Sequence, residues 1–435
     1  MMMRLFAGAL ALCLAGPAFA QIEIQEVESP GGITAWLVEE HSIPFVALEL
    51  RFGGGGNADP EGRRGAVNLM TALLEEGAGD LDAAGFAVAQ EELAASFRFS
   101  AGNDAVSVSA RFLTENRDEA LDLLRLALTE PRFDDAAVER VRGQVLASIR
   151  SDQRSAGAIA AREFNALAYG DHPYGSPLDG TEESVAALTR ADLQEAHARA
   201  LTRGRLQVAA VGDITAEELG PLLDRLLADL PLDGPEPPPD VAVGVTGGTT
   251  IIDFAAPQSV ILFGQGGIAF DDPDYFAAFV LNEVLGGGRF STRLMRELRE
   301  RRGLTYGVGT SLVGRDHSDA LLGQVSVPNA RVAEAVELIR EEWARLAAEG
   351  LTPEELERAQ VFLTGAYPLR FDGNATIAGI LVGMQAQGMP IDYPNTRNDR
   401  IMAVTLEDVQ RVAARLLDPE GLHFVIVGQP EGMDG

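Results

Sequence analysis

The chain has 435 residues, a length that accommodates two domains with a hydrophobic core each. With 46% hydrophobic and 23% charged residues, the composition is that of a folded protein and not of a disordered one. The formal net charge of −30 argues against binding to nucleic acid or to an anionic membrane surface, because both would repel the chain.

Residues 1–20 have the pattern of a secretory signal peptide. Arg4 precedes an apolar run, and Ala18-Phe19-Ala20 supplies the small-x-small cleavage pattern before Gln21. The run is too short to span a bilayer, and no later stretch reaches the roughly 20 apolar residues of a spanning helix. The only cysteine, Cys13, lies in this segment, so the mature chain can form neither a disulfide nor a thiolate metal site. We expect an exported, periplasmic protein without membrane insertion.

The first α/β half occupies residues 21–230. It contains a short amphipathic helix between two glycines, at residues 65–77, whose apolar face consists of Val67, Met70 and Leu74. The pattern further predicts a strand, a helix with a leucine stripe, a second helix and a closing apolar strand, at residues 106–112, 121–128, 133–140 and 206–212.

A linker at residues 231–248 separates this half from a second one at residues 249–435. The linker begins with a proline-rich run, which favours extended geometry, and we expect it to be flexible. The landmarks of the first half recur after it, at a nearly constant spacing of roughly 215 residues, far longer than the repeats of solenoid proteins. The recurring elements are a strand, two helices and a closing strand, at residues 321–327, 332–343, 351–358 and 422–428.

This repeat predicts the fold class α+β, with two homologous α/β halves. Pairs of helices separate the strands, so the helices of each half should cover one face of a mostly antiparallel sheet. Two such halves joined by a linker would form a clamshell.

No motif in the chain indicates an autonomous active site. The glycines at 53–56 and 286–288 are not followed by Lys-Ser/Thr, so neither run is a phosphate loop. Glu75 and Glu76 are adjacent, point to different helix faces and make poor metal ligands alone. No two histidines have the spacing of a zinc-binding helix. The five are His41, His172, His197, His317 and His423.

The helix at residues 65–77 resembles the active-site helix of the pitrilysin/insulinase family of zinc peptidases, which carries His-x-x-Glu-His. With both glycines aligned, Asn68 and Ala72 stand where the family has its zinc-binding histidines, and Thr71 stands where it has the general-base glutamate. The region of the family's third ligand, a glutamate on a later helix, reads Gly143 to Arg150 here and has no carboxylate. The resemblance therefore implies a degenerate metal site without zinc in this chain.

The resemblance extends over nearly the whole mature chain and implies the fold of pitrilysin and of the mitochondrial processing peptidase. The loop Gly-Asp-His-Pro-Tyr-Gly around His172 also occurs in family members, where it is part of the scaffold. Residues 285–308 resemble the family's second-half signature, in which an arginine and a tyrosine bind substrate and stabilise the tetrahedral intermediate. These positions correspond to Arg299 and Tyr306, and Gly303 should end the helix between them.

Some bacterial members of the family are similar to split enzymes, with the zinc motif on one chain and the arginine–tyrosine pair on another. The resemblance therefore implies a non-catalytic subunit of a periplasmic heterodimeric zinc peptidase. Such a subunit would pair with a homologous chain that carries His-x-x-Glu-His, help to enclose unfolded peptides and present Arg299 and Tyr306 to the partner's zinc. We expect no activity from this chain alone.

Two alternatives remain open at this point. The chain could be a peptide-binding or structural scaffold with no role in hydrolysis, in which case Arg299 and Tyr306 would be dispensable. In that case Arg299 would belong to a solvated basic helix face with Arg296 and Arg302, and Tyr306 would begin a strand. The chain could also be an autonomous peptidase whose metal ligands follow another pattern.

Overall fold

The computed structural model describes residues 22–433, so the predicted signal peptide lies outside the described residues. The first half contains β1 (Gln25–Glu28), β2 (Thr34–Glu39), β3 (Phe45–Gly53), α1 (Ala66–Thr71), β4 (Gly77–Ala78), β5 (Leu81–Asp82), α2 (Ala83–Glu92), β6 (Ser96–Ala101), β7 (Ala105–Leu113), α3 (Arg117–Thr129), α4 (Asp135–Asp152), α5 (Ala156–Tyr169), α6 (Glu182–Ala187), α7 (Arg190–Ala200), β8 (Leu206–Gly212) and α8 (Ala216–Leu227).

The second half contains β9 (Gly248–Asp253), β10 (Gln258–Gly266), α9 (Tyr275–Leu285), the π-helical segment η5 (Met295–Arg301), β11 (Val308–Arg315), β12 (Ser318–Pro328), α10 (Val332–Glu349), α11 (Pro353–Ala366), the 3₁₀ turn η7 (Tyr367–Arg370), α12 (Asn374–Ala386), α13 (Tyr393–Met402), α14 (Leu406–Leu416) and β13 (His423–Gly428). Within residues 22–433, no helix combines the length and apolarity that crossing a membrane requires.

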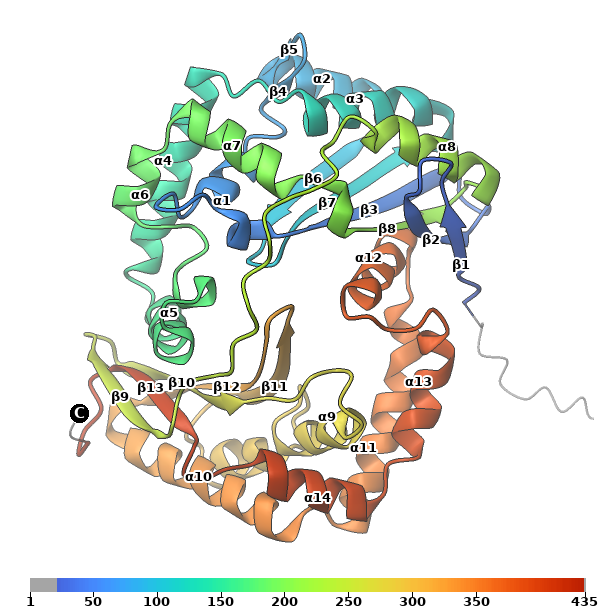
Figure 1. The fold of residues 1–435 in the computed structure, drawn as a ribbon. Coiled ribbons are helices and arrows are strands. Elements are labelled where there is room, and N and C mark those ends of the chain that lie inside the picture. Colours follow the sequence, from blue (N-terminus) through green and yellow to red (C-terminus); the bar gives the residue numbers. More distant parts are fainter. Residues whose placement is uncertain (1–21, 434–435) are drawn as a thin grey trace, which may run out of the picture.

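Each half is built on one mostly antiparallel sheet, which confirms the predicted fold class (Figure 1). The strand order is β1-β2-β8-β3-β7-β6 in the first half and β11-β12-β10-β13-β9 in the second. In each sheet one pair is parallel, β2 with β8 and β9 with β13. The predicted strand at residues 106–112 is β7, and the closing strands of the repeat are β8 and β13.

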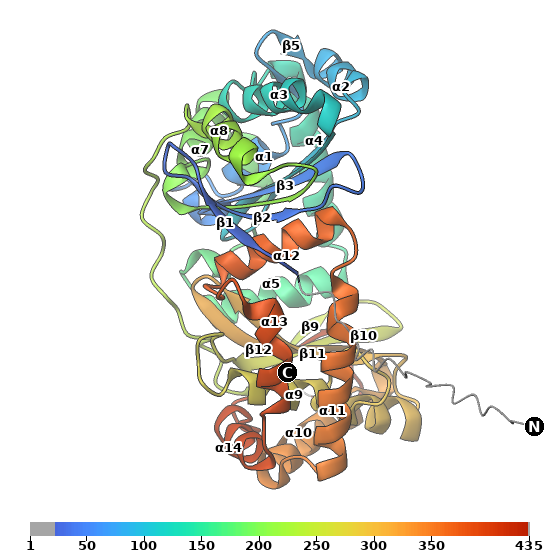
Figure 2. The same cartoon turned by 90° about the vertical axis from the view of Figure 1, so that its right-hand side faces the viewer.

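Strand β8 of the first sheet is buried on both faces over most of its length, and different halves cover the two faces. On β8, Val208 and Ala210 belong to the core formed with the half's own helices, whereas Ala209 and Val211 pack on the other face. That second face is covered by α12, a helix of the other half (Figures 1 and 2). Gln385 of α12 also donates a hydrogen bond of 2.8 Å to the carbonyl of Val208.

The second sheet repeats this arrangement with the roles reversed. On β13, Phe424 and Ile426 pack against the half's own helices, whereas Val425 and Val427 pack with Phe164 of α5, which comes from the first half. The helices of each half cover one face of its sheet, as predicted. The second face receives one helix from the opposite half, which the sequence does not predict, because β-strand alternation does not say what covers a face.

The linker is extended and is hydrogen-bonded to both halves. Between residues 231 and 247 it forms no helix or strand, and Figure 2 shows it running along one side of the molecule. Pro231 accepts a hydrogen bond from the amide of Arg203, and the amides of Val241 and Gly244 donate to His317 and Ala168. The linker that the sequence predicted to be flexible is therefore fixed at several points.

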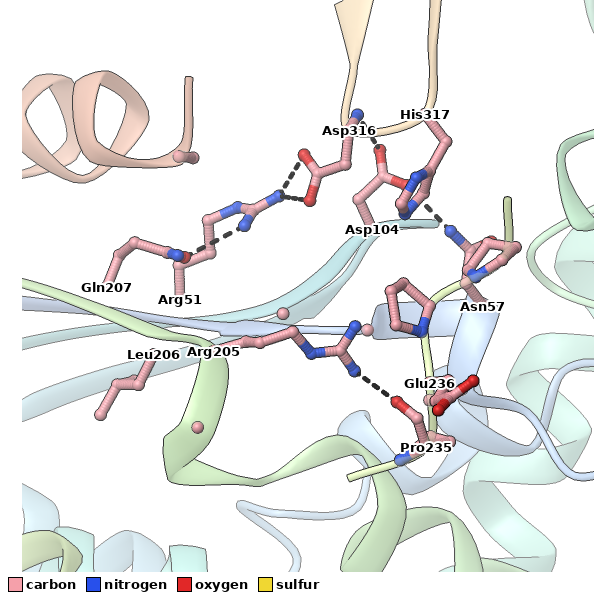
Figure 3. A pocket seen from close by; sticks show the side chains of 17 residues that line it. Arg51, Asn57, Asp104, Arg205, Leu206, Gln207, Pro235, Glu236, Asp316 and His317 are labelled. Carbon is pink, nitrogen blue, oxygen red and sulfur yellow. Dashed lines mark hydrogen bonds and ion pairs between the residues drawn. The ribbon is translucent and has the colours of Figure 1, made fainter. Parts of the chain in front are cut away.

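The turn between β11 and β12 forms a polar junction with the first half (Figure 3). Arg51 of β3 donates two hydrogen bonds of 2.8 Å to the carboxylate of Asp316. Arg315 stacks over the rings of Tyr169 and Tyr174, with its guanidinium carbon 4.9 and 4.8 Å from the ring centres. These contacts join residues of opposite halves and hold the halves in one arrangement.

We predict that Arg51→Ala weakens the junction between the halves. The ion pair with Asp316 is only partly exposed, so its loss should lower the free energy of unfolding by about 1 kcal/mol. It should also raise the rate of proteolysis within residues 231–247. Arg63→Ala is the control, because Arg63 forms a 2.8 Å ion pair with Asp192 inside the first half. Equal proteolysis of the two variants would contradict a role of Arg51 in joining the halves.

Candidate functional site

Helix α1 is anchored at its start by a buried acidic residue. Asp59 accepts hydrogen bonds from the amides of Val67 and Gly65, at 2.7 and 3.0 Å, and pairs with Arg64 at 3.2 Å. Burial raises the pKa of the Asp59 carboxyl, and the two amides and Arg64 oppose that shift. Arg64 also donates to the carbonyls of Pro177 and Pro173, in the loop around His172. The position of α1 therefore depends on residues other than the degenerate metal positions.

The three degenerate positions do not form a metal site. Asn68 is half-buried, Thr71 is buried and Ala72 is exposed at the end of the helix. The hydroxyl of Thr71 has no hydrogen-bond partner in the described part of the chain. An alanine methyl cannot ligate zinc, and a neutral amide and a buried hydroxyl do not replace the imidazole and carboxylate groups that zinc prefers.

Helix α1 is also shorter than predicted. It ends at Thr71, whereas the sequence indicated a helix across residues 65–77. Beyond it the amides of Leu73, Leu74 and Glu76 donate to carbonyls three residues earlier, so the chain continues as tight turns. Gly77 then takes a φ of 114°, a conformation that other residues rarely adopt.

The carboxylates near α1 do not supply the missing ligands. Glu76 is ion-paired with Arg140 of α4, the helix that also carries the segment from Gly143 to Arg150. Glu75 is exposed, and its pKa is raised by partial burial and by the neighbouring charge of Glu76. Among residues 22–433, no group of three or more histidine, cysteine, aspartate or glutamate side chains could hold a metal ion.

Arg299 differs from the other arginines of its segment. Arg293, Arg296, Arg301 and Arg302 each lie within 4.0 Å of a carboxylate of Glu355 or Glu297. Arg299 has no such partner among the described residues. Its guanidinium carbon instead lies 4.4 Å from the ring centre of Phe290, a side chain that is 67% exposed. The other arginines of this basic helix face are therefore ion-paired, whereas Arg299 has no carboxylate partner among the described residues.

Tyr306 is the most exposed of the large hydrophobic side chains in the described chain, at 90%. It follows Gly303, whose φ of 61° ends the helical segment as predicted, and it precedes the edge strand β11. Such an exposed phenol can donate a hydrogen bond to a group that approaches from outside. Arg299 and Tyr306 thus lie on one short segment, available to an external partner. Phe290 completes this exposed group, and no pattern in the sequence singles it out.

His172 has the scaffold role that the sequence indicated. Its Nδ1 accepts from the amide of Tyr174, so its Nε2 must carry the proton that it donates to the carbonyl of Pro239, each at 3.2 Å. The neutral imidazole therefore joins the loop to the linker. Burial is the main cause that lowers the pKa of His172.

A cavity of about 340 Å³ lies beside the junction of the halves (Figure 3). Its charged and polar groups largely bind one another. Arg51 pairs with Asp316, Arg205 donates to the carbonyl of Pro235, and Asp104 accepts from Asn57. This cavity is therefore part of the connection between the halves. The sequence gives no signal for it, because Arg51 and Asp316 are 265 residues apart.

The chain is similar to known proteins over most of its length. The family described as insulinase, peptidase family M16, matches residues 35–182, and the peptidase M16 inactive domain matches residues 187–362. A non-peptidase homolog from Helicobacter pylori, YmxG, is 26% identical over 89% of this chain and 90% of its own. An uncharacterized zinc protease from Mycobacterium leprae is 28% identical over 89% of this chain and 88% of its own.

A solved structure supports the same assignment. The crystal structure of a peptidase M16 inactive domain from Pseudomonas fluorescens matches with a TM-score of 0.86 and 28% identity. The match covers 95% of this chain and all of that structure.

We predict that the purified mature chain binds no stoichiometric zinc, because α1 offers no pair of ligands. The double variant Asn68→His/Ala72→His should gain weak zinc affinity, since two histidines four residues apart face the same side of a helix. Metal analysis after gel filtration measures both. One zinc per wild-type chain that a chelator removes would contradict the account of a degenerate site.

We predict that His172 titrates at a lower pH than His41. His172 should titrate below the ordinary value of about 6.5, whereas hydrogen bonds to Asp213 and Glu39 raise the pKa of exposed His41 above it. The folded state favours neutral His172, so its contribution to stability is present above pH 6.5 and is lost as the pH falls through the lower folded pKa. NMR of histidine-labelled protein measures both values. The reverse order would contradict burial as the main influence on the pKa of His172.

Proposed function

We propose that this chain, which belongs to the insulinase (M16) family of peptidases, acts as the non-catalytic subunit of a periplasmic heterodimeric zinc peptidase. Its likeness to a non-peptidase homolog and to an M16 inactive domain supports a non-catalytic role. The partner is a homologous chain that carries His-x-x-Glu-His. Together the two chains enclose and cleave unfolded peptides.

The observation that carries this proposal is the contrast between Arg299 and its neighbours. A guanidinium with no carboxylate partner can use its planar set of donors on a carbonyl or carboxylate from another molecule. Arg296 and Arg302 cannot do so without giving up ion pairs. Tyr306 adds one hydroxyl donor with no protein cover. The two side chains would gain strength as donors when a partner subunit excludes water from them.

The zinc, its bound water and the glutamate base would all belong to the partner. A metal-bound water needs three protein ligands and an open position, and α1 of this chain provides none of them. The division of labour is therefore complementary: the partner activates the nucleophile, and this chain stabilises the oxyanion. The periplasmic location rests on the signal peptide predicted at residues 1–20.

A scaffold role without hydrolysis is the second candidate, and the retained anchoring of α1 is compatible with it. Asp59 and Arg64 hold α1 in place although its metal positions are lost. A scaffold needs that packing and has no use for an unpaired arginine. The two candidates therefore differ in whether Arg299 and Tyr306 matter to peptide turnover.

We predict that Arg299→Ala and Tyr306→Phe lower the kcat of the purified two-subunit complex by about 10²–10³-fold, the usual cost of removing one oxyanion donor. Assembly should be unaffected, because neither side chain is buried in this chain. Peptide hydrolysis and gel filtration of each reconstituted complex measure the two quantities.

Arg302→Ala is the matched control, since Arg302 lies on the same segment and is ion-paired with Glu297 and Glu334. It should leave kcat close to that of the wild type. Wild-type turnover by both the Arg299→Ala and Tyr306→Phe complexes would favour the scaffold and reject the contribution of these residues.

A further inference from the structure

The second half contains a cavity that no step of the proposed function uses. Its volume is about 480 Å³, within the range of small-molecule sites. It lies between α9, η7, α12 and α13, all of them elements of the second half. Figures 1 and 2 show α13 running from the end of α12 alongside α11, so that these helices enclose one region.

Aromatic side chains from three elements line the cavity. Tyr275 and Phe279 of α9 stack with their ring centres 6.2 Å apart, and Phe276 lies 6.3 Å from the ring of Tyr393 on α13. On α12, Gly379 and Gly383 line the cavity, and a Cβ added at either would meet no atom within 4 Å. The glycines leave space that a larger residue would fill. The walls therefore suit a flat or branched apolar group.

Arg397 of α13 brings a positive charge into this apolar site. Only two arginines in the described chain are buried below a tenth of their surface, Arg293 at 7% and Arg397 at 5%. Arg293 binds both carboxylate oxygens of Glu355, at 3.0 and 2.6 Å. Arg397 has no carboxylate within 4.0 Å among residues 22–433. A buried cation without a counter-ion is costly, so its lack of a partner needs an explanation.

The protein groups around Arg397 compensate its charge only partly. It donates to the carbonyl of Leu363 and to the side chain of Asn398, at 3.2 and 3.3 Å. Its guanidinium carbon lies 4.1 Å from the ring centre of Tyr367 and 5.4 Å from that of Phe279. These are neutral groups. Burial accordingly lowers the pKa of Arg397. Tyr393 and Tyr367 oppose that shift, and nearby Arg370 adds to it.

The acidic residues at the start of α9 are already engaged. Asp272 and Asp274 bind Arg415 and Arg411 of α14, at 2.5 and 2.6 Å. The second arginine that lines the cavity, Arg370, is exposed and likewise has no ion-pair partner in the described chain. Two unpaired cations thus meet at one cavity of a protein whose net charge is −30.

We propose that this cavity binds a carboxylate that carries an aromatic or branched apolar group. The apolar group packs among Tyr275, Phe276 and Tyr367, and the carboxylate is the missing partner of Arg397. Tyrosine hydroxyls add donors, because burial raises the pKa of Tyr275 and of Tyr367 to about 12 and both stay protonated at neutral pH. A single negative charge matches the one buried guanidinium, because the charge of exposed Arg370 is already hydrated, whereas a phosphate would demand more donors.

The test uses the purified mature chain without any partner, so its outcome is independent of the proposed function. Isothermal titration compares N-acetyl-phenylalanine with its amide, which has the same ring and no charge. The acid should bind saturably, and the amide should bind at least about tenfold more weakly. A tenfold difference in Kd corresponds to the loss of one charge-assisted hydrogen bond. Equal binding of both compounds, or no saturable binding of the acid, would overturn the proposal.

Variants locate the binding in the cavity. Arg397→Gln removes the charge, and Gly379→Leu fills space in the cavity while Arg397 keeps its charge. Each should weaken binding of the acid about tenfold or more. Arg400→Gln is the control, because Arg400 is exposed on the same helix and does not line this cavity. If circular dichroism shows that Arg397→Gln does not fold, the affinity of Gly379→Leu for the acid tests the site alone. An unchanged affinity in that variant would refute the site.

Two further ligands distinguish the source of the carboxylate. 3-Phenylpropionate represents a free organic acid, and a short peptide ending in phenylalanine represents a peptide C-terminus. Both contain the proposed chemistry, so binding of either supports the site. Binding of the peptide together with the small acid would indicate that the cavity accepts a C-terminal residue, and binding of the small acid alone would indicate a metabolite. Binding of neither would overturn the proposal.

Discussion

Each half of the molecule contributes one helix to the core of the other half, α12 to the first and α5 to the second. Without α12, the face of the first sheet that holds Ala209 and Val211 would be open to water, and without α5 the same would hold for Val425 and Val427 of the second. Exposed sheet faces of this kind are costly because the hydrophobic effect favours their burial. Neither half is therefore a complete folding unit, and the arrangement of the two is set by their cores as well as by the linker. The junction of Arg51 with Asp316 adds a polar contact to an arrangement that apolar packing already fixes.

This packing explains how α1 is held in place without a bound metal. Helix α1 is positioned by Asp59, Arg64 and the buried side chains of Val67 and Met70, none of which is a metal ligand. Asn68 and Ala72 stand where the family has its zinc-binding histidines, and Thr71 stands where it has the general-base glutamate. These residues remove ionisable groups from the helix without opening its core. The opposite holds for the segment of Arg299, where the neighbouring arginines are paired and this one is left unpaired. Among the described residues, the first half thus has no metal-binding cluster, whereas the second half has an arginine without a carboxylate partner and an exposed tyrosine.

Much of the fold is predictable from the sequence, because it follows from local patterns. The alternation at residues 106–112 predicts the strand observed as β7, and the repeat predicts the closing strands observed as β8 and β13. Gly303 ends the helical segment with a positive φ, as its position after that segment indicates. Contacts between distant residues were not predictable. No local pattern reveals that α12 crosses to the first sheet or that Arg51 meets Asp316. The end of α1 at Thr71 is not predictable from the sequence either, because the apolar spacing of Leu73 and Leu74 fits a longer helix. The backbone there forms tight turns instead. For the site, the family signature indicated Arg299 and Tyr306, but the missing partners of Arg299 and of Arg397 became visible only with the carboxylates placed in space.

The central claim is that this chain works only together with a zinc-bearing partner. The most direct measurement is to isolate the tagged mature chain from native periplasm and to compare the zinc-dependent peptide hydrolysis of that eluate with that of the chain purified alone. The account predicts activity in the native eluate only, with a co-eluting homologous protein that carries His-x-x-Glu-His. Chelator-sensitive activity of the chain alone would contradict the degenerate metal site. Inactivity of both preparations without such a partner would contradict the role in a peptidase.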